Sequence, residues 1–367
     1  MIANLLLYFL VFYALFIAAL TVTALLPDRK ISHGKQQPEN ISIVIPCKNE
    51  ATNIPSLIAA LERQEYPAAT EVIFIDDGST DTTAYIIEEV GKKSSIPVRL
   101  LPGRYTQKRC LTSKQQAIDL GIREASYKVI ALTDADMQPK TGWLASLAGC
   151  LHDDTALVFG HTVISPANSA FSLFQSFQLE FLFAVAWSFH KCRIAGSCMG
   201  NNLLLRKEAY IKSGGHDATG YSITEDQALL RHFNRMHLKT ASTTPFYPSA
   251  STYPHHDIRP FIRQMHRWGR GGFKTGVNLL PIGVLLIIQN IAFIAECIAL
   301  PLTEVNHIAG INFLLTWFFV AAVFRKNRSP VSSLFFPVYY LLLIIETALL
   351  SPLILLRRTV TWKERPV

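Results

Sequence analysis

Charged side chains are scarce in this chain of 367 residues. Asp, Glu, Lys and Arg make up 17% of it, whereas hydrophobic residues make up 50%. A typical soluble domain carries roughly 25% charged residues. The shortfall argues against an entirely soluble protein and indicates that part of the chain lies in lipid. The length suffices for one α/β domain of ordinary size together with membrane helices.

Several signatures are missing as well. None of the six cysteines forms a CxxC pair, which argues against a disulfide framework and a zinc site in favour of a reduced compartment. No GxGxxG follows the first expected strand, which disfavours a dinucleotide oxidoreductase. Helix-turn-helix and RNA-binding patterns are lacking, so the net charge of +8 does not indicate nucleic acid. The basic residues instead collect beside apolar segments, where membrane lipids with anionic headgroups are the expected partners.

The N-terminal stretch from Leu5 to Leu26 contains no charged residue. A helix needs roughly 20 apolar residues to cross a bilayer. A secretory signal peptide has a positive start and an apolar core of about 7–15 residues, and this stretch has neither. We therefore expect a transmembrane anchor within residues 1–28. Arg29, Lys30 and Lys35 follow it, and the positive-inside tendency predicts that they are cytoplasmic.

Residues 40–258 are predicted to form an α/β catalytic domain with a mostly parallel sheet. The segments expected to be strands are Ile41–Ile45, Glu71–Ile75 and Lys128–Leu132. Helix-like stretches run from Asn53 to Arg63 and from Asp81 to Val90. Apolar strands alternating with helices indicate parallel strands joined by crossover helices. Ligands bind such sheets beyond the carboxyl ends of the strands.

The C-terminal part is expected to be membrane-bound. An interfacial amphipathic segment at 259–278 is followed by membrane segments over 279–358 and a tail at 359–367. The apolar stretches lie near 280–303, 308–324 and 331–356. Three crossings would place the basic tail outside, against the positive-inside tendency, so two and three spans both stay open.

Two acidic motifs stand at expected strand ends. In Asp76-Asp77-Gly78-Ser79 a carboxylate could accept hydrogen bonds from a nucleoside, although a solvated Asp-Gly turn is the alternative. In Thr133-Asp134-Ala135-Asp136 the two acids alternate in a segment expected to be extended, so both would face one site. Two carboxylates and a diphosphate suit Mg²⁺ or Mn²⁺, and the alternative is again a polar turn.

Two further motifs follow along the chain. In Thr224-Glu225-Asp226 a carboxylate could take the proton from an attacking hydroxyl. A helix start with Thr224 as N-cap is compatible with that role, because the helix dipole favours acids there. In Gln264-Met265-His266-Arg267-Trp268 the guanidinium could hold a diphosphate and the indole could face a sugar ring. The alternative is an interfacial helix with snorkelling arginines.

The order of these motifs resembles the membrane-bound branch of glycosyltransferase family 2. That branch includes cellulose, hyaluronan and chitin synthases and ceramide glucosyltransferases. The segments Ile45–Glu50 and Gly200–Asn202, together with Pro139 and Trp143, also match its pattern. The resemblance covers roughly residues 41–275.

The resemblance implies a GT-A fold, inverting transfer and a Mg²⁺ or Mn²⁺ cofactor. It makes Asp226 the general base and Asp136 the metal ligand. The residues that it assigns to donor binding are Glu50, Asp77, Lys114, Asp134 and Arg267. The residues that it assigns to the acceptor or diphosphate site are Gln264, Trp268, Glu225 and Asn201.

The expected function is transfer of a sugar from a nucleotide-sugar donor, a UDP-sugar by family habit, to a lipid or lipid-linked acceptor. The expected place is the cytoplasmic face of the cell (inner) membrane. The few spans and the lack of an FxVTxK-like segment disfavour a processive polysaccharide synthase, which stays open as an alternative. A non-catalytic scaffold that binds a nucleotide sugar is the other alternative. The apolar, aromatic stretch Phe171–Phe189 is either a core or membrane-surface helix or a membrane-dipping wall of the lipid-acceptor site.

Overall fold

The computed structural model divides the chain into two compact units. The described residues are 2–26, 38–107, 110–192, 197–244, 249–274, 279–298, 304–326, 333–356, 361–362 and 365–366. The α/β unit comprises residues 29–190, 195–256 and 361–367. The helical unit comprises residues 1–28, 191–194 and 257–360. The basic residues Arg29, Lys30 and Lys35, on which the predicted orientation depends, lie outside the described residues.

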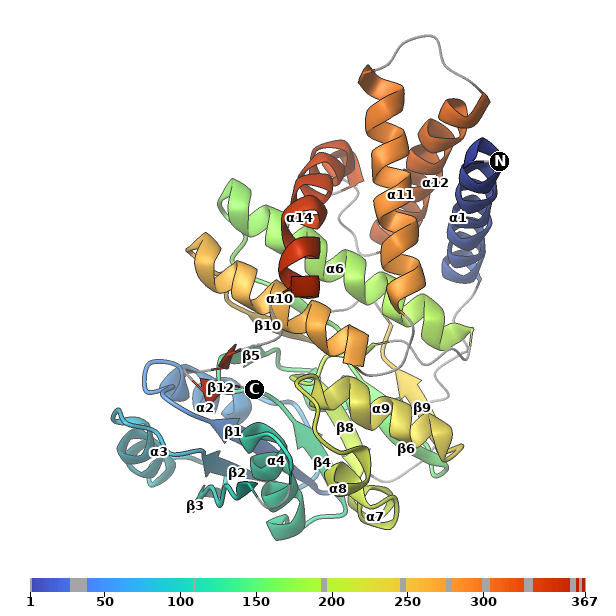
Figure 1. Ribbon diagram of the computed structural model, residues 1–367. Coiled ribbons are helices and arrows are strands. Elements are labelled where there is room, and N and C mark those ends of the chain that lie inside the picture. The colour runs from blue at the N-terminus through green and yellow to red at the C-terminus, as the bar shows by residue number, and fades with distance from the viewer. Residues whose placement is uncertain are drawn as a thin grey trace. The chain divides into compact units, whose positions relative to one another are not determined.

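A seven-stranded sheet forms the centre of the α/β unit (Figure 1). Its strands are β1 (Ile41–Cys47), β2 (Thr70–Asp76), β3 (Val98–Pro102), β4 (Val129–Leu132), β6 (Thr155–Phe159), β8 (Leu203–Arg206) and β9 (Lys239–Ser242). The strand order is β3-β2-β1-β4-β8-β6-β9. The first four are parallel, whereas β8 runs antiparallel to both β4 and β6. The three predicted strands are confirmed, and β8 makes the sheet mixed.

The strands of a second, smaller sheet alternate along the chain with strands of the large sheet. It joins β5 (Met137–Pro139), β10 (Ala250–Thr252) and β7 (Thr162–Ile164) in that order. The strand β5 follows β4 after only four residues, Thr133–Asp136. The acidic motif at the end of β4 is therefore the link between the two sheets.

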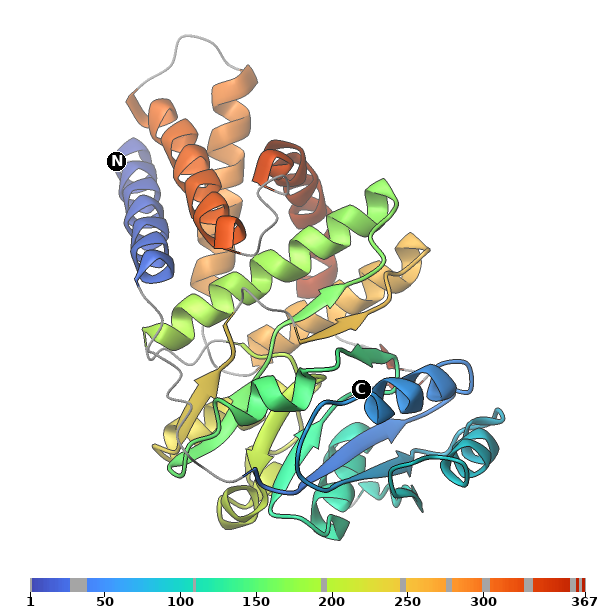
Figure 2. The same ribbon diagram turned by 180° about the vertical axis from the view of Figure 1, so that it is seen from behind.

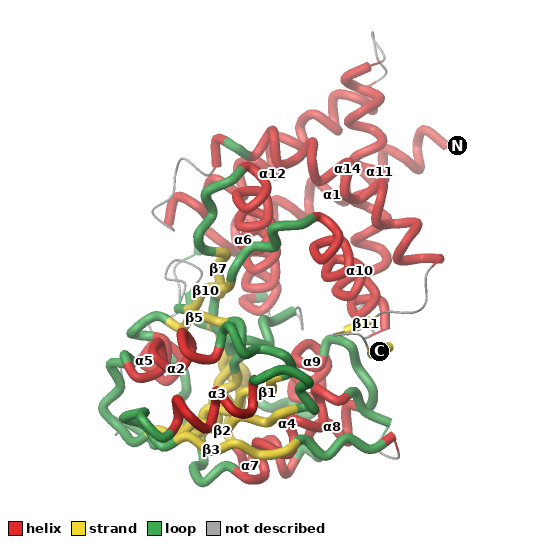
Figure 3. The backbone as a smooth tube through the Cα atoms, turned by 90° about the vertical axis from the view of Figure 1, so that its left-hand side faces the viewer, coloured by secondary structure: helices red, strands yellow, loops and turns green. Residues whose placement is uncertain are grey.

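The parallel strands are buried on both faces, as their continuous apolar composition predicts. All seven residues of β1 are buried. The side chains of Ile41, Ile43 and Ile45 belong to a core shared with α2 (Ile54–Glu62) and α5 (Trp143–Ala148). Val44, which alternates with them, faces α4 (Ser113–Glu124) on the other side. Figure 3 shows α2 and α5 on one side of the sheet and α4 on the other.

Gly121 marks the tightest approach of α4 to the sheet. A Cβ atom at this position would lie 2.6 Å from Ile75 Cδ1 and closer still to Val44 Cγ1. Alanine has the higher helix propensity by about 1 kcal/mol, so substitution would stabilise an isolated helix. Overpacking a core costs about 1–3 kcal/mol, which outweighs that gain. The sequence position of this glycine is therefore set by packing.

We expect Gly121→Ala to lower the melting temperature of the purified full-length protein by several degrees. The matched control is Gly142→Ala, because a Cβ atom at Gly142 would meet nothing within 4 Å. Thermal unfolding followed by circular dichroism would measure both variants. Equal melting temperatures for the two variants would contradict the close packing of α4.

The remaining helices of the α/β unit cover the ends and faces of the sheets. They are α3 (Thr83–Gly91), α6 (Ala170–Lys191), α7 (Lys207–Lys212), α8 (Gly215–Thr219) and α9 (Glu225–Arg235). The predicted helices at 53–63 and 81–90 are confirmed as α2 and α3. In α6 the side-chain amide of Gln175 donates to His255 O and accepts from His255 N–H, both at 2.9 Å. This contact ties the aromatic helix to the chain that follows β10.

The helical unit consists of long helices, most of them apolar, whereas Ile258–Lys274 carries four arginines and a lysine. The helices are α1 (Ile2–Leu25), α10 (Ile258–Lys274), α11 (Leu279–Ile298), α12 (Glu304–Lys326) and α14 (Phe336–Leu356). Helices α1, α11 and α12 lie side by side, and both Figure 1 and Figure 2 show this packing. Asn312 joins all three, because its Nδ2 donates to Leu10 O at 3.0 Å and to Gln289 Oε1 at 2.8 Å. Buried amides of this kind bond helices together in an apolar environment.

Four helices in the described part of the chain are long and apolar enough to cross a membrane. Their apolar windows are Asn4–Leu25, Ala170–Lys191, His307–Phe324 and Phe336–Ile354. The stretch at 308–324 belongs to a helix of 23 residues. The stretch at 280–303 contains the apolar part of α11, Leu285–Ile298, and residues 299–303 lie outside the described ones.

Candidate active site

The predicted nucleoside-binding acids stand at one edge of the large sheet. Glu50 follows β1, Asp77 follows β2 and Asp134 follows β4. Because β1 pairs in parallel with both β2 and β4, the carboxyl ends of these strands meet at the same edge. The backbone N–H of Asp77 donates to Cys47 O at 2.8 Å, which fixes the end of β2 against that of β1. The sequence-predicted clustering is therefore present for these three residues.

Lys114 links this edge to the start of α9. Its Nζ atom lies 2.9 Å from Asp134 Oδ1 and 2.8 Å from Glu225 Oε1. Burial opposes the charge of Lys114, but the two carboxylates outweigh it and raise the pKa of this lysine above its ordinary value. Lys114 therefore stays protonated and holds two acids that are 91 residues apart along the chain on one ammonium group.

Asp226 occupies the first turn of α9 next to this ion pair. Its Oδ2 accepts from Gly200 N–H at 2.7 Å, and its Oδ1 accepts from Gln227 N–H at 2.8 Å. Enclosure by protein atoms raises the pKa of Asp226 to about 6, and the charge of Glu225 adds to that rise. The two N–H groups and Lys114 act in the opposite direction. A carboxylate with a pKa near neutrality is suited to exchange protons at physiological pH.

Thr224 occupies the N-cap position that the sequence predicts for α9. Its side chain, however, makes no capping hydrogen bond, and its buried Oγ1 has no partner among the described residues. The start of α9 is therefore held by contacts from elsewhere in the chain, and not by its own cap.

Gly200 contacts the Asp226 carboxylate, a contact that the sequence did not predict. A Cβ atom there would lie 2.9 Å from both Cβ and Oδ2 of Asp226. Only glycine brings its backbone N–H so close to that carboxylate. Neighbouring Asn201 accepts from Thr162 Oγ1 at 3.2 Å, and buried Asn202 accepts from Trp143 Nε1 at 2.9 Å. The Gly-Asn-Asn match was visible in the sequence, but the bond to Asp226 depends on tertiary structure.

The segment Thr133–Asp136 differs from the prediction. It is a turn, closed by Met137 N–H donating to Asp134 O at 3.3 Å, and not an extended segment. The argument that alternation points both acids the same way is therefore wrong. Asp134 is partly buried against Lys114, whereas Asp136 is exposed.

The acids after β4 fit a shared metal site better than a complete protein cage. No group of three or more His, Cys, Asp or Glu side chains within the described ranges is arranged to hold a metal ion. Asp134 and Asp136 offer carboxylate oxygens, which suit Mg²⁺ or Mn²⁺. Such ions commonly take one or two protein carboxylates and complete their coordination with phosphate oxygens and water.

Gln264, Arg267 and Trp268 lie in α10, which belongs to the helical unit. Within that unit α10 packs against α14: Arg270 Nη1 donates to Ile354 O at 3.1 Å, and Gly269 leaves room for the Ile354 side chain. Phe261 and Met265, four residues apart, are the buried side of α10. The roles predicted for Gln264, Arg267 and Trp268 at the diphosphate and acceptor stay predictions.

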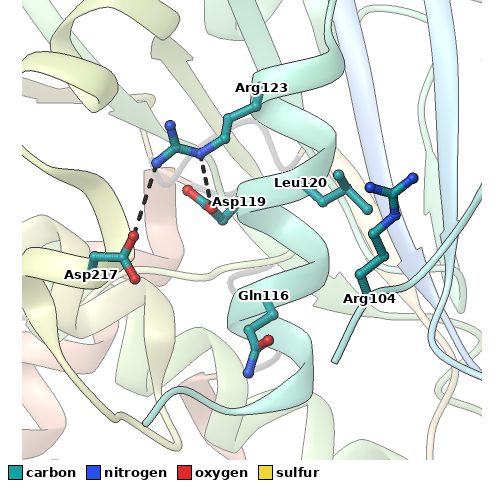
Figure 4. Close-up of a pocket in the computed structure, with 6 residues that line it drawn as sticks. All are labelled: Arg104, Gln116, Asp119, Leu120, Arg123 and Asp217. Atoms are coloured by element: carbon teal, nitrogen blue, oxygen red, sulfur yellow. Dashed lines mark hydrogen bonds and ion pairs between the residues drawn. The ribbon is translucent and has the colours of Figure 1, made fainter. Parts of the chain in front are cut away.

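A separate cavity of about 300 Å³ lies beside α4 (Figure 4). It is lined by Arg104, Gln116, Asp119, Leu120, Arg123 and Asp217. Figure 4 shows Arg123 turned toward Asp119 and Asp217, which it contacts at 3.0 and 4.0 Å. The lining includes none of the acids described above, so the cavity is distinct from the acidic site.

Comparison with known proteins agrees with this arrangement. The family model described as "Glycosyl transferase family 2" matches residues 42–214. The chain is 34% identical over 101 residues to a poly-beta-1,6-N-acetyl-D-glucosamine synthase of Staphylococcus epidermidis, covering 28% of this chain and 23% of that protein. It is 27% identical over 242 residues to a beta-monoglucosyldiacylglycerol synthase of Nostoc sp., covering 64% and 49%. The chain thus spans 23% and 49% of the lengths of these two relatives.

A solved structure shares the fold over nearly the whole chain. It is a mannosyltransferase of Pyrobaculum calidifontis in complex with GDP-Man and Mn²⁺, with a TM-score of 0.58 and 15% identity. The match covers 97% of this chain and 99% of that one. At this identity the likeness concerns the fold alone, which is the predicted GT-A fold.

Proposed function

Because residues 42–214 match the family model described as "Glycosyl transferase family 2", we propose that this chain transfers a sugar from a nucleotide-sugar donor to a lipid or lipid-linked acceptor. The observation that carries the proposal is the joined cluster of Asp134, Lys114 and Glu225 beside Asp226. A base and a cationic group at the edge of a parallel sheet are what transfer from a diphosphate donor requires. The apolar helices support a membrane acceptor.

In the proposed reaction Asp226 removes the proton from the acceptor hydroxyl. The hydroxyl oxygen then forms a bond to the anomeric carbon, and the bond from that carbon to the diphosphate oxygen breaks. The bonding electron pair leaves with the nucleoside diphosphate, and attack from the opposite face inverts the anomeric centre. Gly200 N–H and Gln227 N–H hold the Asp226 carboxylate in place during the proton transfer.

The donor is proposed to lie along the edge formed by the ends of β1, β2 and β4. Asp77 and Glu50 are proposed to contact the nucleoside, and Asp134 the ribose and diphosphate. Asp136, with Asp134, would hold Mg²⁺ or Mn²⁺. The cation would neutralise charge that develops on the leaving diphosphate. The mannosyltransferase of the same fold contains Mn²⁺ and a nucleotide sugar, which supports this assignment.

A lipid acceptor is supported by the Nostoc relative, whose name describes the synthesis of a glucosyl diacylglycerol. A processive polysaccharide synthase is the second candidate, because the Staphylococcus epidermidis relative is named as a synthase of a polysaccharide. Membranes containing the protein, supplied with one labelled UDP- or GDP-sugar at a time, would decide between them. We expect lipids heavier by one sugar or a few sugars. Long polymer would establish the second candidate, and no transfer from any donor would refute both.

We expect the turnover number to fall as the pH decreases through about 6, because Asp226 accepts a proton only when ionised and its pKa is raised to about 6. Activity should be full above this pH and lost below it. Initial rates at saturating donor and acceptor between pH 5 and 8 would measure this low-pH side of the pH–rate profile, which we call the acid limb.

Glu225→Gln should move that acid limb to lower pH, because the charge of Glu225 helps to raise the pKa of Asp226. The matched control is Glu208→Gln, which removes an exposed carboxylate paired with Lys212 on α7. A limb that shifts equally in both variants would show that Asp226 is not the group being titrated.

A further inference from the structure

Two consecutive residues of α4 reach the chain that leads into α9. Lys114 forms the ion pair with Glu225 described above. Gln115 Nε2 donates to Gly220 O at 2.9 Å, and Gln115 Oε1 accepts from Ser222 N–H at 3.1 Å. Gly220 and Ser222 belong to the short connection between the end of α8 and the start of α9. The start of α4 therefore binds both this connection and the first residue of α9.

Gln115 has a local role that does not account for these bonds. It completes a capping box at the start of α4, because its N–H donates to Thr112 Oγ1 at 3.1 Å and its Oε1 accepts from Thr112 N–H at 3.0 Å. A capping box needs only the side-chain oxygen, and Glu serves as well as Gln. The amide nitrogen, which a Glu would lack, is the group that donates to Gly220 O. The glutamine thus serves a distant segment as well as its own helix.

The other hydrogen bonds of this segment among the described residues are short-range. Thr219 Oγ1 donates to Gly220 O at 3.3 Å, and Gly220 N–H donates to His216 O at 3.0 Å. Ser222 and Thr224 bond to each other: Ser222 Oγ donates to Thr224 O at 2.9 Å, and Thr224 N–H donates back to Ser222 Oγ at 3.2 Å. The Thr224 side chain does not cap α9. The fully buried side chain of Gln115 therefore links this segment to helix α4, which covers the sheet.

We infer that Gln115 is a positioning residue, which sets the place of the Asp226 carboxylate by fixing Gly220 and Ser222 ahead of α9. The inference rests on the proposed function. Lys114 and Gln115 together fix the position of the start of α9 relative to the start of α4. A displacement of about 1 Å of a catalytic group can cost on the order of 10²-fold in rate. Loss of the Gln115 amide should therefore lower turnover without removing any group that touches substrate.

The next residue provides a matched control. Gln116 is also buried, and its amide also bonds to backbone: Oε1 accepts from Thr106 N–H at 2.8 Å, and Nε2 donates to Thr106 O at 2.8 Å and Leu111 O at 3.2 Å. These partners lie in the loop between β3 and α4, and Gln116 lines the separate cavity (Figure 4). Gln116→Met removes as many buried hydrogen bonds from the same turn as Gln115→Met, but none of them leads to α9.

The test compares Gln115→Met and Gln116→Met in the full-length protein. We expect both to lower the melting temperature by a similar amount. Only Gln115→Met should lower the turnover number, by about tenfold or more, while the donor KM changes by less than about threefold. Its acid limb should also move to lower pH, because water admitted around the start of α9 relieves the enclosure of Asp226.

Equal kinetic effects in the two variants, or unchanged turnover in Gln115→Met, would overturn the role of Gln115. If Gln115→Met does not fold, Gln115→Asn takes its place. Its amide is one methylene shorter and is withdrawn from Gly220 O and Ser222 N–H, so turnover should still fall. A wild-type protein that transfers no sugar would instead refute the proposed function, so the two failures are distinguishable.

Discussion

Replacing Asp226 with Asn is expected to lower the transfer rate by about 10²–10⁴-fold while donor binding is retained. The amide cannot accept the acceptor proton, but it has nearly the same shape. One of the two N–H groups that Asp226 accepts from would keep its acceptor. Donor affinity, measured by displacement of a labelled nucleotide, should change little, because the proposed donor contacts come from Asp77, Asp134 and their strand ends.

The same variant should not lower stability near pH 7. The pKa of Asp226 is raised to about 6, above that of an unfolded carboxyl, so folding disfavours its ionised form. A neutral isostere also removes the repulsion from Glu225. A fall in turnover without a fall in melting temperature would therefore identify a chemical defect, and not an unfolded protein.

Asp217→Asn is the matched control, since Asp217 is half-exposed on α8 and lies 4.0 Å from Arg123. It should leave turnover within about twofold of the wild type. If Asp226→Asn kept a tenth or more of the wild-type rate, another group would have to act as the base.

The central strands were predictable because the relevant signals are local. Ile41–Ile45 and Lys128–Leu132 are apolar runs that end in polar turn residues, and a parallel sheet buries such runs on both faces. The rule that ligands bind beyond the carboxyl ends of strands then places Asp77 and Asp134 at one edge. The antiparallel β8 was not predicted, since four residues, Leu203–Arg206, carry too short a pattern to define a pairing.

The contacts that organise the site could not be predicted from local patterns. Glu225 meets Lys114, and Gly200 meets Asp226, across separations of 111 and 26 residues. No spacing rule in the sequence encodes such contacts. The Thr133–Asp136 segment was misassigned for another reason: strand alternation was extended past the last residue of β4, where Asp134 O closes a turn. The sequence thus proposes the residue types of the site, and the geometry that joins them comes from tertiary packing.

The turn after β4 contains Asp136, whose substitution is expected to have the second large effect on the transfer rate. Asp134 is engaged by Lys114, whereas Asp136 is exposed two residues later. Asp136 is therefore the carboxylate of this pair that a cation shared with a bound diphosphate could reach from solvent. Asp136→Ala should lower the transfer rate by about 10²–10³-fold, the usual cost of losing one group that stabilises developing charge.

Mn²⁺ binding provides a readout of Asp136 that does not depend on turnover. In the presence of the nucleoside diphosphate, Asp136→Ala should bind Mn²⁺ at least about tenfold more weakly than the wild type by titration calorimetry. The matched control Asp154→Ala removes an exposed carboxylate paired with Lys239, and such surface pairs contribute only about 0–1 kcal/mol. It should retain both affinity and rate. Unchanged Mn²⁺ affinity in Asp136→Ala would assign the cation to other ligands, and an unchanged rate would show that the turn after β4 takes no part in the transfer.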